Sequence, residues 1–332
     1  MSKTKNNKTK LIYGVLIILL VVLLVASTLL LLNRWEQGRG LFPAHDDFFD
    51  TSIKVDGINY VLKDDVQSVL VLGLDKFESE KDDSGFYNDQ QADFLMLFVI
   101  DNEDKSYSVI HLNRDTMVDI NVLGVAGEKI DTFFGQLALA HTYGNGKEVS
   151  CRNTADAVSG LLNNVNIERY ISVTMDAVPV ITDLVGGVKL EIKDDFSSID
   201  DSLVMGETIK LSGEQALNFV RTRYGLEDSS NESRMLRQRE YVTSLFDALN
   251  EKYIEDEDFL EKVTFDLSEY IVSNFTVTQM ENLIDSLSNY EFKDIYVIDG
   301  ESKIGEKFLE FYADEDSVNN LVLDLFYTPE DR

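Results

Sequence analysis

An uninterrupted apolar run near the amino terminus constrains this chain more than any other feature. Residues 11–32, LIYGVLIILLVVLLVASTLLLL, contain no charged side chain. A helix of about 20 apolar residues crosses the roughly 30 Å hydrocarbon core of a bilayer. We therefore expect a transmembrane helix over residues 11–32, with the larger part of the chain on one side of a membrane.

The residues around this run predict its orientation. The first ten residues carry four lysines and no acidic residue, and such positive charge favours the cytoplasmic side. A cleavable signal peptide usually has an apolar region of only about 7–15 residues, whereas this run is longer and is followed by Arg34 and Trp35 as interface anchors. We expect a cytoplasmic tail (1–10), a signal anchor in the cell membrane (11–32), a juxtamembrane linker (33–50) and an extracytoplasmic body.

Composition limits what that body can be. Of the 332 residues of the whole chain, 44% are hydrophobic, which is ample for a folded core. The formal net charge of −30 argues against nucleic acid as a partner, because nucleic-acid binding needs a basic surface. The single cysteine, Cys151, permits no internal disulfide, so the core alone must hold the body together.

Short apolar runs predict three neighbouring strands. They are residues 68–73 (SVLVLG), 94–100 (FLMLFVI) and 106–112 (SYSVIHL), and continuous apolar runs of this length are typical of strands buried on both faces. Before them, Asp56-Gly57 lies between alternating apolar positions and predicts an accessory hairpin over residues 51–67. Residues 129–146 are expected to form a loop or broken helix, and helices and strands alternate over the rest of the chain.

Charged residues stand at the ends of the three strands. Asp75 follows the first, Asp93 precedes the second, and Arg114 and Asp115 follow the third. If consecutive strands run antiparallel, all four lie at one edge of the sheet. Two carboxylates there make a plausible magnesium site, because Mg²⁺ prefers oxygen ligands and often takes one or two carboxylates plus phosphate and water.

A second cluster is basic and lies in residues 211–240. Ser212 and Gln215 form a capping box that predicts a short helix ending near Arg221. Arg221 and Arg223 would share a face if the chain is extended there. The remaining members of the cluster are Arg234, Arg237 and Gln238, which have the spacing of one helical face. Guanidinium groups bind phosphate oxygens in pairs, so the cluster predicts a diphosphate site. Surface ion pairs with the abundant acidic residues are the alternative.

The motifs in this order resemble the LytR-CpsA-Psr family of bacterial envelope proteins. The matching segments are VLVLGLDK, ADFLMLFVIDNEDKSYSVIHLNRDTM, KID at Lys129, VNIERYISVTMDAVPVITDLVGGVKLEI, LSGEQALNFVRTR and RMLRQRE. The resemblance implies an α/β fold, a three-layer sandwich with a central mixed sheet flanked by helices, over residues 68–332. It also implies a Mg²⁺-dependent phosphotransferase that moves a glycopolymer, such as teichoic acid or capsular polysaccharide, from an undecaprenyl diphosphate carrier to peptidoglycan.

The resemblance also implies roles for individual residues. Asp75 and Asp93 match the metal ligands, and Arg114 with Asp115 match the catalytic pair beside the phosphates. The residues that match the diphosphate contacts are Lys129, Arg221, Arg223, Arg234, Arg237 and Gln238. Three positions depart from the family pattern: Lys76 and Gln91 stand where arginine is usual, and Asn231 stands where an acidic residue is common.

Two alternatives remain open at the level of sequence. The same residues would serve a polyprenyl diphosphate pyrophosphatase, in which water replaces the sugar hydroxyl. The other alternative is a regulator of the transcriptional-attenuator type that binds polyprenyl phosphate without catalysis. Only about ten residues would face the cytoplasm, which argues against direct control of genes.

Overall fold

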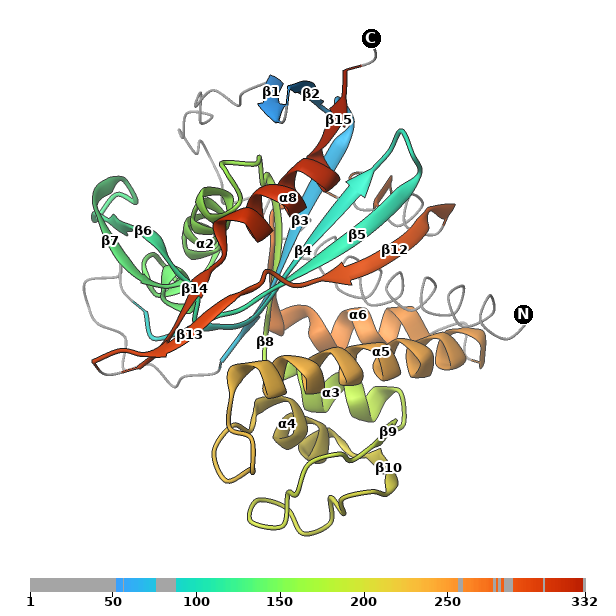
Figure 1. The fold of residues 1–332 in the computed structure, drawn as a ribbon. Coiled ribbons are helices and arrows are strands. Elements are labelled where there is room, and N and C mark those ends of the chain that lie inside the picture. Colours follow the sequence, from blue (N-terminus) through green and yellow to red (C-terminus); the bar gives the residue numbers. More distant parts are fainter. Residues whose placement is uncertain are drawn as a thin grey trace. The chain divides into compact units, whose positions relative to one another are not determined.

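Figure 1 shows the computed structural model of the chain. The structure describes residues 52–55, 57–75, 88–255, 259–276, 279, 282–283, 289–306 and 308–330. The predicted tail, transmembrane helix and linker, residues 1–50, lie outside the described residues, as does Lys76. Within the described part, no helix is both long enough and apolar enough to cross a membrane.

The described residues divide into two compact units. The helical unit contains residues 73–75 and 172–292, and the sheet unit contains residues 52–72, 88–171 and 293–330, apart from the gaps given above. The chain passes between the units within strands of the central sheet.

The central sheet contains the three strands that the apolar runs predict. Its six strands follow the order β11 (Ile271–Ser273), β8 (Arg169–Thr174), β3 (Val66–Leu74), β4 (Ala92–Asp101), β5 (Ser106–Leu112) and β12 (Glu291–Tyr296). Strands β4 and β5 are antiparallel, with Leu95 opposite Leu112. Consecutive residues of both strands are buried, so both faces of this part of the sheet are covered. The expected α/β fold with a central mixed sheet is confirmed, whereas its three-layer order stays a prediction.

Smaller sheets complete the sheet unit. Strands β1 (Ser52–Val55) and β2 (Ile58–Leu62) form the predicted accessory hairpin, and β15 (Tyr327–Pro329) extends it by pairing with β2. The other elements are β6 (Met117–Leu123), β7 (Lys129–Gln136), the 3-10 helix η1 (Leu137–Thr142), α2 (Glu148–Leu161), β13 (Gly300–Ile304), β14 (Leu309–Ala313) and α8 (Glu315–Phe326). Strand β6 pairs with β7, and β13 pairs with β14 (Figure 1).

One expectation for the sheet unit is wrong. Residues 129–136 form a strand rather than a loop or broken helix, and only residues 137–142 are helical. Most side chains of β7 are exposed, so the strand lacks the buried alternation that identifies a strand in sequence. Residues 129–136 are instead held in an extended conformation by pairing with β6 along the length of the strand.

The helical unit consists mainly of helices, with a two-stranded sheet packed against two of them. It contains α3 (Ala177–Leu184), β9 (Val188–Glu191), β10 (Thr208–Leu211), α4 (Gly213–Arg221), α5 (Asn231–Glu255), α6 (Phe259–Leu267) and the short η2 (Ser268–Tyr270). Helix α3 packs on α4 and α6, and α5 packs on α4, α6 and β9. Helix α3 ends at Leu184, and Gly186 and Gly187 follow it with positive φ angles of 75° and 99°, which favour glycine.

Candidate functional site

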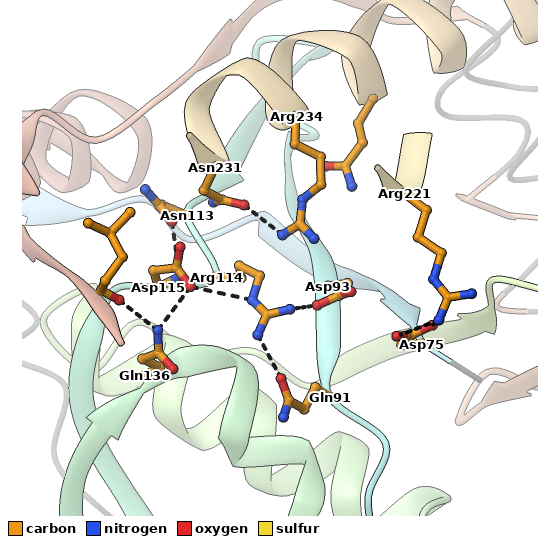
Figure 2. Close-up of polar contacts among 12 residues, drawn as sticks. Asp75, Gln91, Asp93, Asn113, Arg114, Asp115, Gln136, Arg221, Asn231 and Arg234 are labelled. Carbon is orange, nitrogen blue, oxygen red and sulfur yellow. Dashed lines mark hydrogen bonds and ion pairs between the residues drawn. The ribbon is translucent and has the colours of Figure 1, made fainter. Parts of the chain in front are cut away.

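In the sheet unit, Arg114 connects two acidic side chains (Figure 2). Leu95 of β4 lies opposite Leu112 of β5. The same register, continued by two residues, brings Asp93 near the start of β4 alongside Arg114, which follows the end of β5. The Nη1 atom of Arg114 forms an ion pair with Asp93 Oδ1, and its Nε lies 3.5 Å from Asp115 Oδ1. Strand pairing therefore confirms that Asp93, Arg114 and Asp115 come together at one sheet edge.

Arg114 is further fixed by Gln91, one of the departures from the family pattern. Its Nη2 donates to Gln91 Oε1 at 2.6 Å. The side chain of Arg114 is only 13% exposed, and a buried guanidinium is stabilised when its donors find acceptors. The glutamine thus holds the guanidinium by a neutral hydrogen bond at a position where an arginine would repel it.

Asp115 is almost fully buried and is held from three directions. Its backbone N–H donates to Asn113 Oδ1 at 2.9 Å, and Gln136 Nε2 donates to its Oδ1 at 3.0 Å. Its carbonyl accepts from the backbone N–H of Phe311 at 2.9 Å. Gln136 also donates to the carbonyl of Leu309 at 2.8 Å, which fixes its own orientation. Sequence reasoning missed Gln136, because only the β6–β7 pairing places it beside Asp115.

In the helical unit, Arg221 binds Asp75 (Figure 2). The predicted capping box at Ser212 and Gln215 is present and begins α4, whose last residue is Arg221. The Nη2 atom of Arg221 lies 2.9 Å from Asp75 Oδ1 and 3.1 Å from Oδ2. The Arg221 side chain is 49% exposed, so the pair contributes little to stability and its guanidinium can exchange partners.

Arg237 and Gln238 of α5 bind the carboxyl end of α4. Arg237 Nε donates to the carbonyl of Phe219 at 3.1 Å, and its Nη2 donates to the carbonyl of Thr222. Its Nη1 donates to Ser233 Oγ and to Asp194 Oδ2, each at 2.8 Å. Gln238 Nε2 lies 3.4 Å from the carbonyl of Val220. These contacts satisfy carbonyls that a helix end leaves without intrahelical partners, and they fix the segment that carries Arg221 and Arg223.

Arg234 is buried on the first turns of α5. Its Nη2 donates to Asn231 Oδ1 at 2.6 Å (Figure 2). Arg223, two residues beyond α4, is half-buried and lies with its guanidinium carbon 5.9 Å from the ring centre of Tyr224. The expectation that Arg221 and Arg223 form a fork stays a prediction.

The predicted residues thus form two sets. The sheet unit brings together Asp93, Arg114 and Asp115, and the helical unit brings together Asp75 with Arg221, and Arg234, Arg237 and Gln238 along α5. Lys129 is exposed at the start of β7, opposite Leu123 and at the other end of the β6–β7 hairpin from Gln136. Coordination of one ion by Asp75 and Asp93 stays a prediction, because the two residues belong to different units.

The donor chemistry fits magnesium. Carboxylate oxygens are the ligands Mg²⁺ prefers, and both aspartates are paired with arginines, which shows that each is placed where positive charge is favoured. The described residues contain no group of three or more His, Cys, Asp or Glu side chains arranged around a common point. Either aspartate would therefore need substrate phosphate and water as further ligands to hold Mg²⁺, which is common for this ion.

Comparison with known proteins gives a consistent result. The sequence pattern of the LytR_cpsA_psr family matches residues 44–321. The chain is 30% identical over 179 residues to the polyisoprenyl-teichoic acid–peptidoglycan teichoic acid transferase TagU of Enterococcus faecalis, covering 54% of this chain and 52% of that protein. It is 27% identical over 197 residues to TagU of Halalkalibacterium halodurans, covering 59% and 57%. The alignments thus span about half the length of these curated relatives.

The fold is also similar to solved structures. The crystal structure of Bacillus subtilis TagV aligns with a TM-score of 0.57 at 21% identity, over 78% of this chain and 95% of that one. A protein of Streptococcus agalactiae, gbs0355, aligns with a TM-score of 0.63 at 18% identity, over 78% of this chain and 86% of that one. At these identities the likeness supports the fold.

Proposed function

Since the chain belongs to the LytR_cpsA_psr family, we propose that it transfers a glycopolymer from an undecaprenyl diphosphate carrier to peptidoglycan. The observation that carries the proposal is the pairing of Arg114 with both Asp93 and Asp115 at one sheet edge. Reaction at a phosphate requires that its negative charge is neutralised and that a hydroxyl approaches it. The buried guanidinium of Arg114 suits the first requirement, and the carboxylate of Asp115 suits the second. The names of the TagU relatives, which specify teichoic acid transfer to peptidoglycan, support the same reaction class.

The arginines of the helical unit bind the diphosphate of the carrier. Arg221 is exposed and leaves Asp75 for a phosphate oxygen, because a phosphate offers a guanidinium stronger charge-assisted hydrogen bonds than a solvated carboxylate does. Arg223 and Arg234 add further donors. Arg237 and Gln238 act mainly as positioning residues, since their donors bind the carbonyls of Phe219, Val220 and Thr222.

The residues of the sheet unit act on the acceptor hydroxyl and on the negative charge that develops on the transferred phosphoryl group. Asp115 orients the acceptor hydroxyl and accepts its proton, while the acceptor oxygen forms a new bond to the phosphorus attached to the glycopolymer. The bond between that phosphorus and the bridging oxygen breaks, and undecaprenyl phosphate leaves with the electron pair. Arg114 stabilises negative charge on the transferred phosphoryl group. Mg²⁺ held by Asp75 and Asp93 would neutralise phosphate charge.

The apolar run at residues 11–32 gives this proposal its location. Anchored by that segment with residues 1–10 in the cytoplasm, the described residues would lie outside the cell membrane, where a lipid-linked polymer meets peptidoglycan. A three-layer arrangement of helices on both faces of the central sheet would leave room for the polyprenyl chain.

One assay separates transfer from hydrolysis. The full chain in detergent is given a glycopolymer on undecaprenyl diphosphate, with and without peptidoglycan fragments, and the products are separated by mass. Transfer requires a polymer joined to the fragment by a phosphodiester, lost in Arg114→Ala. Free polymer phosphate as the only product in both conditions would favour the pyrophosphatase, and an unchanged substrate would favour a protein that only binds.

A further inference from the structure

A large groove lies within the sheet unit and belongs to none of the residue sets above. Its volume is about 910 Å³, at the upper end of the range of roughly 300–1,000 Å³ for ligand pockets. It is lined by one face of the β6–β7 hairpin, by α2 and the residues after it, and by the end of β14 with the start of α8.

The hairpin contributes a regular row of side chains. Strand residues two apart point to the same face, and the groove-lining residues of β6 include Met117, Asp119 and Asn121. Their cross-strand partners are Gln136, Phe134 and Thr132. Phe134 and Thr132 also line the groove. Gln136 therefore belongs to the same face, at the end of the row.

This row leads to the acidic residue of the proposed site. Gln136 donates to Asp115 at 3.0 Å, and only Thr116 separates Asp115 from the start of β6. Strand β14, which contributes Tyr312 to the groove, runs beside the same segment through a bridge between Thr116 and Phe311. The end of the groove at Met117 thus lies two residues along the chain from Asp115, whose side chain we assign to the acceptor hydroxyl.

The lining is rich in groups that bind sugars. Amides and hydroxyls both donate and accept, as sugar hydroxyls and acetamido groups require. Those in the groove are Asn121, Thr132, Ser159, Asn163, Asn164 and Asn166. Phe134 is 57% exposed and Tyr312 is 37% exposed, and aromatic rings pack against the apolar C–H face of a sugar ring. The Tyr312 hydroxyl donates to Glu310 at 2.7 Å, which holds that ring in place.

Charge decides between two kinds of sugar polymer. The ionisable residues of the groove are Asp119, Asp156 and Glu315 against Lys129, which gives a net charge of −2. The whole chain, groove included, carries a formal net charge of −30. A polymer with a phosphate in every repeat would be repelled here, whereas carboxylates accept hydrogen bonds from the hydroxyls of an uncharged glycan.

Two asparagines at the rim have unusual backbone conformations. Asn163 and Asn164 follow α2 with φ angles of 56° and 63°. Both lie in the left-handed region, where glycine is favoured and asparagine is tolerated. Retaining two amides at positions suited to glycine is consistent with a use for their side chains, and the Asn163 amide already donates to Asn319 at 2.8 Å.

We propose that this groove binds an uncharged glycan strand of N-acetylhexosamine type and delivers one of its hydroxyls to Asp115. The identity of the strand as the acceptor rests on the proposed function, whereas glycan binding by the groove does not. Phe134 and Tyr312 pack against sugar rings, and Asn164 and Asn166 bind their polar substituents. Lys129 serves the groove rather than a diphosphate.

The test uses the full chain in detergent micelles and two probes. A linear hexamer of N-acetylglucosamine represents the neutral glycan, and inorganic polyphosphate represents an anionic polymer; binding of each is measured by calorimetry. Phe134→Ala removes an exposed ring of the groove. Phe265→Ala is the matched control, because this ring is 80% exposed in the helical unit. Asn164→Gly removes a groove amide at a position whose backbone favours glycine.

The hexamer is expected to bind the unaltered chain, and Phe134→Ala should leave polyphosphate binding unchanged, because the arginines of the helical unit also bind anions. Phe134→Ala should weaken hexamer binding about tenfold, and the control should leave it unchanged. Asn164→Gly should weaken binding without lowering the thermal midpoint. Equal loss in both phenylalanine variants, weaker polyphosphate binding in Phe134→Ala, or no binding of the hexamer would overturn the proposal.

An assay with the lipid diphosphate distinguishes failure of this inference from failure of the proposed function. Phe134→Ala should still bind the lipid diphosphate while losing transfer to a glycan acceptor. If the unaltered chain binds the hexamer through Phe134 and leaves the lipid diphosphate intact, the proposed function fails and the glycan groove stands.

Discussion

The Nη2 atom of Arg234 donates to Asn231 Oδ1 at 2.6 Å, and both residues are buried. In the family pattern an acidic residue is common at the position of Asn231. Such a carboxylate would both orient the Arg234 guanidinium and partly neutralise its charge, whereas the neutral amide of Asn231 only orients it. The Asn231–Arg234 pair therefore carries a charge of +1, which an aspartate in place of Asn231 would cancel.

We expect Asn231→Ala to destabilise the chain by about 1–3 kcal/mol, because a buried donor loses its acceptor. Asn231→Asp restores an acceptor and should recover most of that loss, since a buried guanidinium is stabilised by a counter-charge. The same aspartate should weaken binding of a lipid diphosphate. Urea unfolding followed by circular dichroism measures the first effect, and a lipid-binding titration measures the second. Equal stability of the alanine variant and the unaltered chain would contradict the assigned role.

Substitution of Arg237 should mainly lower stability, whereas substitution of Arg223 should mainly lower activity. Arg237→Lys loses the planar fork that binds Phe219, Thr222, Ser233 and Asp194, and we expect a loss of about 3 kcal/mol. Arg223→Ala should cost less than about 1 kcal/mol while reducing transfer. Unfolding curves and transfer rates of the two variants give the comparison. A stable Arg237→Lys variant with normal helix content would show that the bonds to the end of α4 are dispensable.

Asp75 provides the test of metal dependence. Its pair with Arg221 is partly exposed, so Asp75→Asn should change the free energy of unfolding by no more than about 1 kcal/mol. If Asp75 binds Mg²⁺, the metal-depleted variant should need at least about tenfold more Mg²⁺ to reach half its maximal transfer rate, since it has lost a charged ligand. Asp195→Asn, a change of an exposed aspartate outside both sets, is the control. An unchanged Mg²⁺ requirement in Asp75→Asn would remove Asp75 from the metal site.

The part of the site formed by strand ends could be predicted from sequence. The apolar runs of β4 and β5 fix two adjacent strands, and a short turn between them forces antiparallel pairing, so Asp93 and Arg114 must approach each other. No tertiary information is needed for that step. The helix spacing of Arg234, Arg237 and Gln238 was equally visible, since all three lie on one helix.

What those side chains contact could not be predicted. Arg237 has the spacing of a phosphate ligand, but its acceptors are carbonyls of residues 15 and 18 positions earlier, and only the packing of α5 on α4 brings them near. Gln136 and the groove depend on the β6–β7 hairpin. Its second strand is mostly exposed and carries no alternation of buried and exposed residues, so its sequence resembles that of a loop.

Gln136 should act on rate rather than on binding of the lipid. Its amide holds Asp115 Oδ1, and its second hydrogen bond to Leu309 fixes the amide itself. Gln136→Ala should lower kcat about tenfold with little change in KM for the lipid diphosphate, because the orientation of a group that acts in the transition state is lost. Asn113→Ala, which removes the bond to the backbone of Asp115, should act in the same direction. A rise in KM at unchanged kcat would instead place Gln136 in substrate binding.

His141 makes stability depend on pH. Burial lowers the pKa of this side chain from 6.5 to about 4, and the bond from its Nδ1 to the carbonyl of Gln90 at 2.9 Å only partly opposes that effect. Between these two pH values the unfolded chain binds a proton that the folded chain excludes, so the free energy of unfolding falls as pH is lowered. The loss should approach about 3 kcal/mol near pH 4. His141→Gln keeps a donor for Gln90 without titrating, so its unfolding free energy should fall less between pH 7 and pH 4.5. Urea unfolding of both proteins across that range measures the difference, and parallel curves would show that His141 is protonated in the folded state.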